Sequence, residues 1–460
     1  MYNSNVKSAI VKTIGLLGDF PKNDRLEFQA DLLRNGFVED FAPLSISNYT
    51  DLTSDKRKIH LKDVFYPDFR DLMFIKPENS YNERESLSTR FSKEFTNELY
   101  FVRVDQVTGI VQQSLKFKVV KCEIFLFAEQ IGLFSLTLEL NKSLLNDFTL
   151  NDLIFFCRNF DSLVSFNGDG DTMVWHNYIT SNFICKRKLV GNNVKADEYS
   201  GSKFKVFTAI DCNVSAINRL PYLYDMGTSS KLGSAKGNHY ISPHPEYYDE
   251  LMKNKISIFN NWEALCLFDS FTCVGNGLLV GRDEKDTLFK TNNWEYIYFR
   301  IYLSRVFFKY NLYRYNTNLH ENTFKLRNQF EGFLNNYNLS HISFNFLPNV
   351  IFDKIGAALH LDEELERFQK RINRISSAIQ EKKQSKTNML LQIVTVLGGI
   401  SSVQPVVGLL NRLKTNLGWT SLSFFSVIIS IVVFIGLGVL NWLKPEFFKK
   451  LGKSVKKLWK

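Results

Sequence analysis

One group of residues has a spacing that could line a hydrated path. Small and polar residues recur at intervals of 4, 3, 4 and 3 positions within an otherwise largely apolar segment, namely Asn388, Gln392, Thr395, Gly399 and Ser402. On a helix this spacing places all five on one face, where the amide and hydroxyl groups of several neighbouring helices could surround a pore. The alternative is close packing between helices through small and polar residues. Both interpretations are open for Gly399 and Ser402, whereas Gln392 favours the pore.

A second group of residues could bind an anion. Phosphate groups are recognised by lysine and arginine side chains, and the sequence has two sets of candidates. One is the consecutive run Lys186, Arg187 and Lys188, and the other is Lys231 and Lys236 in the glycine-rich segment 227–238, which we expect to be a mobile loop. A solvated basic surface without a ligand is the alternative for both sets.

Motifs for catalysis or metal binding are weak. The segment 275–281 (GNGLLVG) is one residue too long for a dinucleotide-binding fingerprint. The segment 167–171 (NGDGD) begins like a calcium loop, but Thr172 and Tyr178 stand where that loop needs Gly and Glu. Three further residues could ligate a metal, although such residues in a loop usually do not: His239, His244 and Glu246. The sequence therefore predicts that the protein is not an enzyme.

The polar stripe lies in the first of two apolar segments. Residues 389–410 and 422–443 each contain 22 residues without a charge, and about 20 apolar residues cross a bilayer as a helix. The short link 411–421 would make the two an antiparallel hairpin. The tail 444–460 has seven lysines and one acid. By the positive-inside rule, this places both termini in the cytoplasm. The alternative for the first segment is a buried helix of a soluble domain.

Charge and cysteine content exclude two other classes. The formal net charge is +10, but the tail 444–460 alone supplies +6, so the excess is not spread over a surface that could follow a nucleic acid polymer. The six cysteines show no CxxC pair, which argues against a disulfide scaffold and a cysteine-rich zinc site. They are Cys122, Cys157, Cys185, Cys212, Cys266 and Cys273.

A heptad pattern precedes the first apolar segment. Apolar residues are spaced by 4, 3, 4, 3 and 4 positions, which predicts a coiled-coil seam: Leu361, Leu365, Phe368, Ile372, Ile375 and Ile379. The segment begins acidic and then turns basic, as suits the dipole of a helix that starts near residue 361. We expect one long stalk helix that runs into the membrane and self-associates. An amphipathic helix packed on its own domain is the alternative.

The predicted fold class is a combined α+β and membrane protein with five parts. A large cytoplasmic α/β domain (1–290) is followed by a helical region (291–360), the stalk helix (361–388), the transmembrane hairpin (389–443) and a basic cytoplasmic tail (444–460). Within the first two parts we expect a hairpin of strands at 118–127 and 131–140, a strand at 203–210 and a buried helix at 294–315 that contains four basic residues.

This layout resembles the CorA-type magnesium channels. The resemblance is convincing over roughly residues 290–460, and the segment 385–401 (SKTNMLLQIVTVLGGIS) is similar to the family's entry into its pore helix. It implies a homo-oligomer of five copies in a lipid bilayer. The family carries Gly-Met-Asn at the outer pore mouth, where this sequence has Gly408-Leu-Leu-Asn411. This departure puts ordinary magnesium selectivity in question.

The enlarged cytoplasmic part resembles the CorA-like branch found beside type III CRISPR systems. That resemblance implies an ion channel in the inner membrane of a prokaryote that serves antiviral defence. It would be opened by a small anionic ligand, a nucleotide second messenger that joins adenosylmethionine to AMP. Two alternatives are open: an ordinary magnesium transporter, and a membrane-anchored enzyme or scaffold.

Overall fold

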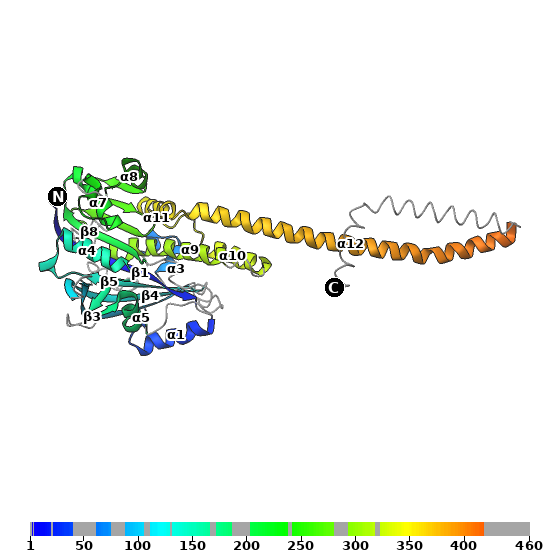
Figure 1. Cartoon of the computed structure of the whole chain (residues 1–460), viewed down its shortest axis with the longest axis horizontal. Helices are drawn as coiled ribbons and strands as arrows, with labels where there is room; N and C mark the ends of the chain where they lie inside the picture. Colours follow the sequence, from blue (N-terminus) through cyan, green and yellow to red (C-terminus); the bar gives the residue numbers. More distant parts are fainter. Residues whose placement is uncertain are drawn as a thin grey trace. The chain divides into compact units, whose positions relative to one another are not determined.

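The computed structural model describes most of the chain up to residue 417. The described residues are 2, 4–19, 22–39, 61–74, 88–104, 111–128, 131–165, 172–185, 203–237, 242–279, 293–317 and 323–417. Contacts divide the chain into two units, Met1–Ile375 and Ser376–Lys460. The first unit contains the sheet and the helices that cover it (Figure 1).

An 11-stranded sheet forms the centre of the first unit, counted over the described residues. Its order is β7-β6-β3-β4-β5-β1-β8-β11-β10-β9, and β2 pairs beside β3. The strands are β1 (Asn5–Asp19), β2 (Val38–Glu39), β3 (Ser88–Val104), β4 (Val111–Phe127), β5 (Ile131–Glu139), β6 (Leu163–Ser165), β7 (Thr172–Val174), β8 (Lys205–Asn213), β9 (Lys255–Phe259), β10 (Trp262–Cys266) and β11 (Ser270–Gly275). The predicted hairpin at 118–127 and 131–140 is confirmed as β4 and β5.

The sheet is mixed. Strands β8 and β11 pair in parallel, whereas the other described pairs, such as β1 with β5 and β1 with β8, are antiparallel. The central strands β5 and β8 are buried at every position but their last. Strands buried on both faces read as nearly continuous apolar runs, which is why the sequence shows only a partial alternation there. The strand predicted at 203–210 is confirmed as β8.

Helices cover both faces of the sheet. Val11 of β1 lines a space together with Leu150 and Leu153 of α4 (Asp147–Arg158). The next residue, Lys12, lies on the ring of Phe299 in α9 (Phe299–Thr317), with its ammonium 4.2 Å from the ring centre. Successive side chains of a strand point to opposite faces, so α4 and α9 lie on opposite sides.

The remaining helices extend these two layers. On the α4 side, α5 (Trp175–Asn182) follows β7, and α7 (Ala216–Thr228) lies against β10 and β11. Later in the chain come α8 (Pro245–Met252), α10 (Thr323–Tyr337) and α11 (Phe346–Ala358). Near the start of the chain lie α1 (Lys22–Arg34) and α3 (Pro67–Met73). Helix α12 (Leu361–Leu417) has 57 residues and begins where the sequence predicted.

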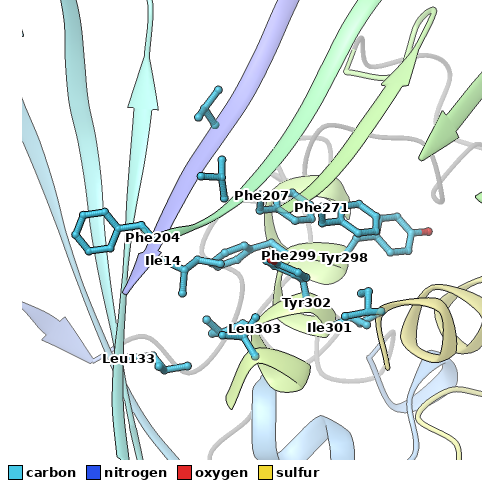
Figure 2. Packing of buried hydrophobic residues seen from close by; sticks show 14 of the residues in the cluster. Ile14, Leu133, Phe204, Phe207, Phe271, Tyr298, Phe299, Ile301, Tyr302 and Leu303 are labelled. Atoms are coloured by element: carbon cyan, nitrogen blue, oxygen red, sulfur yellow. The ribbon is translucent and has the colours of Figure 1, made fainter. Parts of the chain in front are cut away.

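Helix α9 is the centre of one layer. Of its 19 residues 14 are buried, including Arg300 and Lys309, as expected for the basic helix at 294–315. Phe299 packs against Phe125 of β4 and Phe207 of β8, with ring centres 6.5 and 5.6 Å apart. Figure 2 shows Phe299 and Tyr302 of this helix beneath the rings of Phe207 and Phe271. A helix that is buried on nearly every side can belong only to a core.

Four charged side chains are buried between α9 and the sheet. Glu123 of β4 lies 2.7 Å from the ammonium of Lys12, 3.6 Å from Lys121 and 3.8 Å from the guanidinium of Arg300. Burial alone would raise the pKa of Glu123, but the three positive charges outweigh burial and lower this pKa to about 2. Arg300 also donates to the carbonyl oxygen of Met73 at 2.7 Å. The cluster therefore joins β1, β4, α9 and the end of α3.

The membrane part of the predicted fold class is wrong for the residues that the structure describes. In that part of the chain, no helix combines the length and the apolar character that crossing a membrane requires. About 20 apolar residues are needed. The second predicted span, 422–443, and the tail lie outside the described residues.

This finding also overturns the predicted placement in an inner membrane and the interpretation as a membrane channel. Both interpretations depended on two spanning helices. What the structure confirms is the mixed α/β architecture of the first unit and a long helix from residue 361. That helix continues past Pro405 to Leu417.

The described part of the segment 227–238, residues 227–237, is more regular than the loop that its glycines predicted. Helix α7 continues to Thr228, and residues Ser234–Lys236 form a short 3-10 helix, η2. The carboxylate of Asp225 accepts hydrogen bonds from the backbone of Gly233 at 2.6 Å and Ala235 at 3.0 Å, and from the Tyr2 hydroxyl at 2.5 Å. These bonds hold the segment on the first unit.

Replacing Glu123 by Gln should destabilise the first unit strongly. The change leaves the positive charges of Lys12 and Arg300 buried without their carboxylate, which typically costs about 3–5 kcal/mol. Urea unfolding followed by tryptophan fluorescence measures the loss. The matched control is Glu98→Gln, because Glu98 pairs with Lys116 and Lys118 on the exposed surface and should leave stability almost unchanged. Equal losses of stability in both variants would contradict the stabilising role of the buried Glu123 carboxylate.

The same carboxylate predicts a pH dependence. The pKa of Glu123 is lowered in the folded state from 4.5 to about 2, so its contribution to stability is present above pH 4.5. It is lost as pH falls through about 2. The stability difference between the wild type and Glu123→Gln should therefore shrink between pH 5 and pH 2. A difference that stays constant over this range would show that the ionised carboxylate is not what stabilises the fold.

Candidate functional site

The base of helix α12 packs on the first unit. Phe368 of α12 is fully buried, and its ring lies 4.4 Å from that of Phe330 in α10 and 6.1 Å from that of Tyr315 in α9. Leu361 and Ile372 are also buried. The first part of the predicted heptad seam thus contacts its own domain, which was the alternative interpretation. Ile379, the last seam residue, is 40% exposed.

A sharp corner precedes α12. Helix α11 ends at Ala358 and α12 begins at Leu361, so only Leu359 and His360 separate them. His360 has a positive φ of 53°, which is uncommon for a residue other than glycine. Its backbone N–H donates to the carbonyl of Ala357, and its own carbonyl accepts from the N–H of Glu364. The direction of α12 is therefore set within two residues.

Lys309 of α9 holds this corner. Its ammonium donates to the carbonyl of Leu359 at 2.9 Å and to the carboxylate of Glu364, in the first turn of α12, at 2.5 Å. The side chain of Lys309 is 9% exposed and that of Glu364 is 29% exposed. One side chain of the core helix thus contacts both sides of the corner.

The ion pair continues into a larger group of charges, which we call the junction cluster. The ring of Phe268, in the turn between β10 and β11, lies 5.0 Å from the ammonium of Lys309 and 3.9 Å from that of Lys205. The carboxylate of the next residue, Asp269, accepts from Lys205 at 2.6 Å and from Arg158 at 2.8 Å. The junction cluster consists of Arg158, Lys205, Asp269, Lys309 and Glu364.

Each member of the junction cluster comes from the end or the middle of a different element. Arg158 is the last residue of α4 and Lys205 is the first of β8, while Asp269 precedes β11. Arg158 also donates to the carbonyl of Thr228 at the end of α7, at 3.1 Å. The cluster therefore connects both helical layers to the start of α12.

Burial and the neighbouring charges shift the pKa values of two members of the junction cluster, Lys205 and Asp269. Burial lowers the pKa of Lys205, and the Asp269 carboxylate offsets part of that effect. Burial would raise the pKa of Asp269, but Lys205 and Arg158 outweigh it and lower this pKa. The Asp269 carboxylate thus stays ionised near neutral pH. Opposite charges held together in this way couple the positions of the elements that carry them, because moving one leaves the other buried and unpaired.

The ion pairs of the junction cluster connect several helices and strands, and its cations could bind an anion. None of its five members is a Ser, Thr or Cys. In the described ranges, no group of three or more His, Cys, Asp or Glu side chains is arranged to hold a metal ion. His244 and Glu246 lie at the start of α8, whereas His239 and the segment 167–171 fall outside the described residues.

Sequence reasoning did not find the junction cluster. Its members are spread from residue 158 to residue 364, and none belongs to a local motif. Two weak signals were present. Lys309 interrupts an apolar helix, and Glu364 lies in the acidic start of the seam, yet nothing in the sequence joins the two.

The structure separates the predicted anion-binding residues from the cluster or does not describe them. Lys186, Arg187 and Lys188 lie outside the described residues. Lys231 is exposed, and the ammonium of Lys236 lies 4.4 Å from the ring of Tyr2, on the segment that Asp225 fixes. Neither lysine faces a cavity that is described.

The predicted pore-lining residues all lie on α12. Asn388 and Thr395 are exposed and Gln392 is half-buried, while the Thr395 hydroxyl donates to the carbonyl of Leu391 within the same helix. Gly399 and Ser402 are helical, and Gly408 is exposed with no atom within 4 Å of a Cβ built on it. Asn411 is also helical. Their spacing on one helix face agrees with the sequence, and their role in a path stays a prediction.

One cavity lies away from the junction cluster. It has a volume of about 60 Å³ and opens between β1, β5 and α4, with Lys7, Glu139 and Lys142 among its lining residues. Pockets for small-molecule ligands usually measure roughly 300–1,000 Å³. This cavity is therefore too small for a nucleotide.

Lys309 and Glu364 should be energetically coupled. Hydrogen bonds to charged groups contribute about 1.5–3 kcal/mol, so a double-mutant cycle with Lys309→Met and Glu364→Gln should give a coupling in this range. The matched control is the exposed pair Glu366–Lys370 of the same helix, which should show almost no coupling. Hydrogen exchange of the amides at 359–372 should rise in Lys309→Met and not in Lys370→Met. Equal coupling in the two pairs would contradict the role of Lys309.

Comparisons with protein-family models, with curated proteins and with solved structures find no match to this chain. The resemblance to CorA-type channels thus stays a prediction from the sequence.

Proposed function

We propose that the chain is a homo-oligomeric signalling protein in which the first unit binds a small anionic ligand and α12 carries the response to other copies. The observation that supports this proposal is the contact of Lys309 with both sides of the corner before α12. A change at the junction cluster alters the hold on the first turn of this helix. Lys309 belongs to α9, which packs on the sheet, so this contact links the sheet to α12 through one helix.

The part of helix α12 beyond the first unit has the exposed surface expected of a segment that binds a partner. From Ser377 to Thr395 every side chain is exposed except that of Gln392. A helix that no tertiary contact supports is marginal in water, since most helical stability in proteins comes from packing of one face. We therefore expect a partner to cover this part of α12.

A second copy of the chain is the partner that the sequence pattern favours. The seam spacing continues beyond Ile379 through Lys382, Lys386, Met389 and Ile393. Ile379, Met389 and Ile393 are large apolar side chains that are 37–40% exposed. Lysine at a seam position lowers the stability of a coiled coil, so Lys382 and Lys386 would keep the association weak enough to respond to a signal.

The junction cluster has features that suit a phosphate-bearing ligand with an aromatic ring. Three cations, Arg158, Lys205 and Lys309, come together beside Phe268, whose ring is 49% exposed. Cations bind phosphate and aromatic side chains stack on nucleobases. An anion on Lys309 would compete with Glu364. To change the ratio of the form without the Lys309–Glu364 pair to the form with it from 1:99 to 99:1, the anion must bind the form without the pair more tightly by about 5.5 kcal/mol.

Binding of adenylates should depend on the cluster. We expect calorimetry on the full chain to detect binding of ATP or of an adenosylmethionine–AMP conjugate, and to show at least tenfold weaker binding for Phe268→Leu and Lys309→Met. The matched controls are Phe155→Leu, a ring 46% exposed on α4, and Lys231→Ala. Binding that is unchanged in both cluster variants would show that the ligand does not bind at the junction cluster. If neither compound binds, a nucleotide is not the ligand.

Copies of the chain should associate through the exposed seam positions of α12, from Ile379 to Ile393, which we call the distal seam. In a Cys185→Ser background, Ile379→Cys should form a disulfide-linked dimer under mild oxidation, because a parallel coil brings the two copies of this position together. Ser377→Cys is the matched control: it is exposed and two residues away, on the opposite side of the helix. Equal crosslinking in both variants would mean that the seam does not form the contact, as would a monomeric mass of the full chain at all concentrations.

A further inference from the structure

Strand β9 forms one end of the sheet. Among the strands that the structure describes, only β10 pairs with it. The outer edge of such a strand is a template for one more strand, because its backbone groups on that side are available for pairing. Of its five residues, Lys255, Ser257 and Ile258 are exposed.

A row of aromatic side chains continues from the end of β9. The ring of Phe259 lies 6.4 Å from that of Phe346, at the start of α11. Two residues earlier, Phe344 lies 4.3 Å from Tyr66. Phe344 and Phe346 are each 58% exposed and Tyr66 is 37% exposed. We call the exposed surface of Tyr66, Phe344 and Phe346 the edge surface. Contiguous apolar surfaces of this kind mark interaction sites.

The edge surface is held rigidly from behind. The turn after β9 is fixed because Arg219 of α7 donates to the carbonyl of Asn260 at 2.8 Å. At the other end of β9, Lys354 of α11 donates to the carbonyl of Lys253 at 3.1 Å. The segment that carries Phe344 is fixed by Asn349, whose side-chain oxygen accepts from the backbone of Ile342 and Ser343. A surface ordered in advance loses less entropy when it binds.

The size of the edge surface indicates what could cover it. Aromatic side chains bury about 150–250 Å² each, so the exposed parts of the three rings offer roughly 300 Å². A stable dimer of whole proteins needs about 800 Å² from each partner. The surface is too small for that and fits one short strand. The single charge of β9, Lys255, lies at the end away from the rings.

We propose that the edge surface binds a short extended peptide of another protein, which adds a strand to β9 and places large uncharged apolar side chains on the aromatic row. Main-chain hydrogen bonds along β9 would supply affinity, and the rings of Phe344 and Phe346 would select the side chains. This binding site does not depend on the junction cluster or on α12.

The test is a screen of the full chain against a phage library of random heptapeptides. Enriched peptides should carry apolar residues at alternate positions. Measured by fluorescence anisotropy, they should bind the variant with Phe344→Ser and Phe346→Ser at least tenfold more weakly. Ile217→Ser changes a residue that is 90% exposed on α7 and should leave binding unchanged. Bound peptide should also slow hydrogen exchange of the β9 amides.

Three outcomes would overturn the proposal. The first is that no peptide is enriched over the double variant. The second is that enriched peptides bind without protecting β9. The third is that the mass of the full chain falls in the double variant, which would mean that a second copy of the chain occupies the edge surface.

Discussion

The fold depends on one buried carboxylate. Glu123 lies inside the first unit, where an ionised group is stable only with compensating charge, and Lys12, Lys121 and Arg300 provide it. Since these four residues come from β1, β4 and α9, and a buried charge without its partner is strongly destabilising, the pairing with Glu123 fixes where α9 lies on the sheet. Apolar packing of Phe299 and Tyr302 stabilises the same contact without specifying its register (Figure 2).

Fixing α9 also positions the junction. Arg300 and Lys309 are nine residues apart on one helix, so the cluster around Glu123 and the junction cluster are parts of one rigid element. The first holds α9 to the sheet, and the second connects it to the start of α12. The aromatic contacts of Phe368 belong to the apolar side of this joint, whereas the pair of Lys309 with Glu364 is its polar side, where the Glu364 side chain is 29% exposed. The polar side is the one that a charged ligand could reach.

Helix α12 combines two different surfaces along one seam. As far as Ile375 the seam residues pack on the first unit, and from Ile379 onward they are exposed. The same spacing of apolar residues therefore serves intramolecular packing first and has no intramolecular partner among the described residues afterwards. In the function proposed above, copies of the chain would associate through the exposed part of this seam, where Lys382 and Lys386 would limit the strength of the association.

The sequence by itself determined the local elements. Alternation predicted β5, and the segments beside and after it were predicted as the strands β4 and β8. The apolar helix with basic residues predicted α9, and the heptad spacing predicted the start of α12, because each of these patterns reflects neighbours a few residues apart. The tertiary structure decided the rest. It showed that the first part of the seam meets α10, that the segment 227–238 is held by Asp225, and that no described helix could span a membrane. It also brought Arg158, Lys205, Asp269, Lys309 and Glu364 together. A single sequence does not encode such contacts in any local pattern, because they depend on burial and charge between residues as many as 206 positions apart.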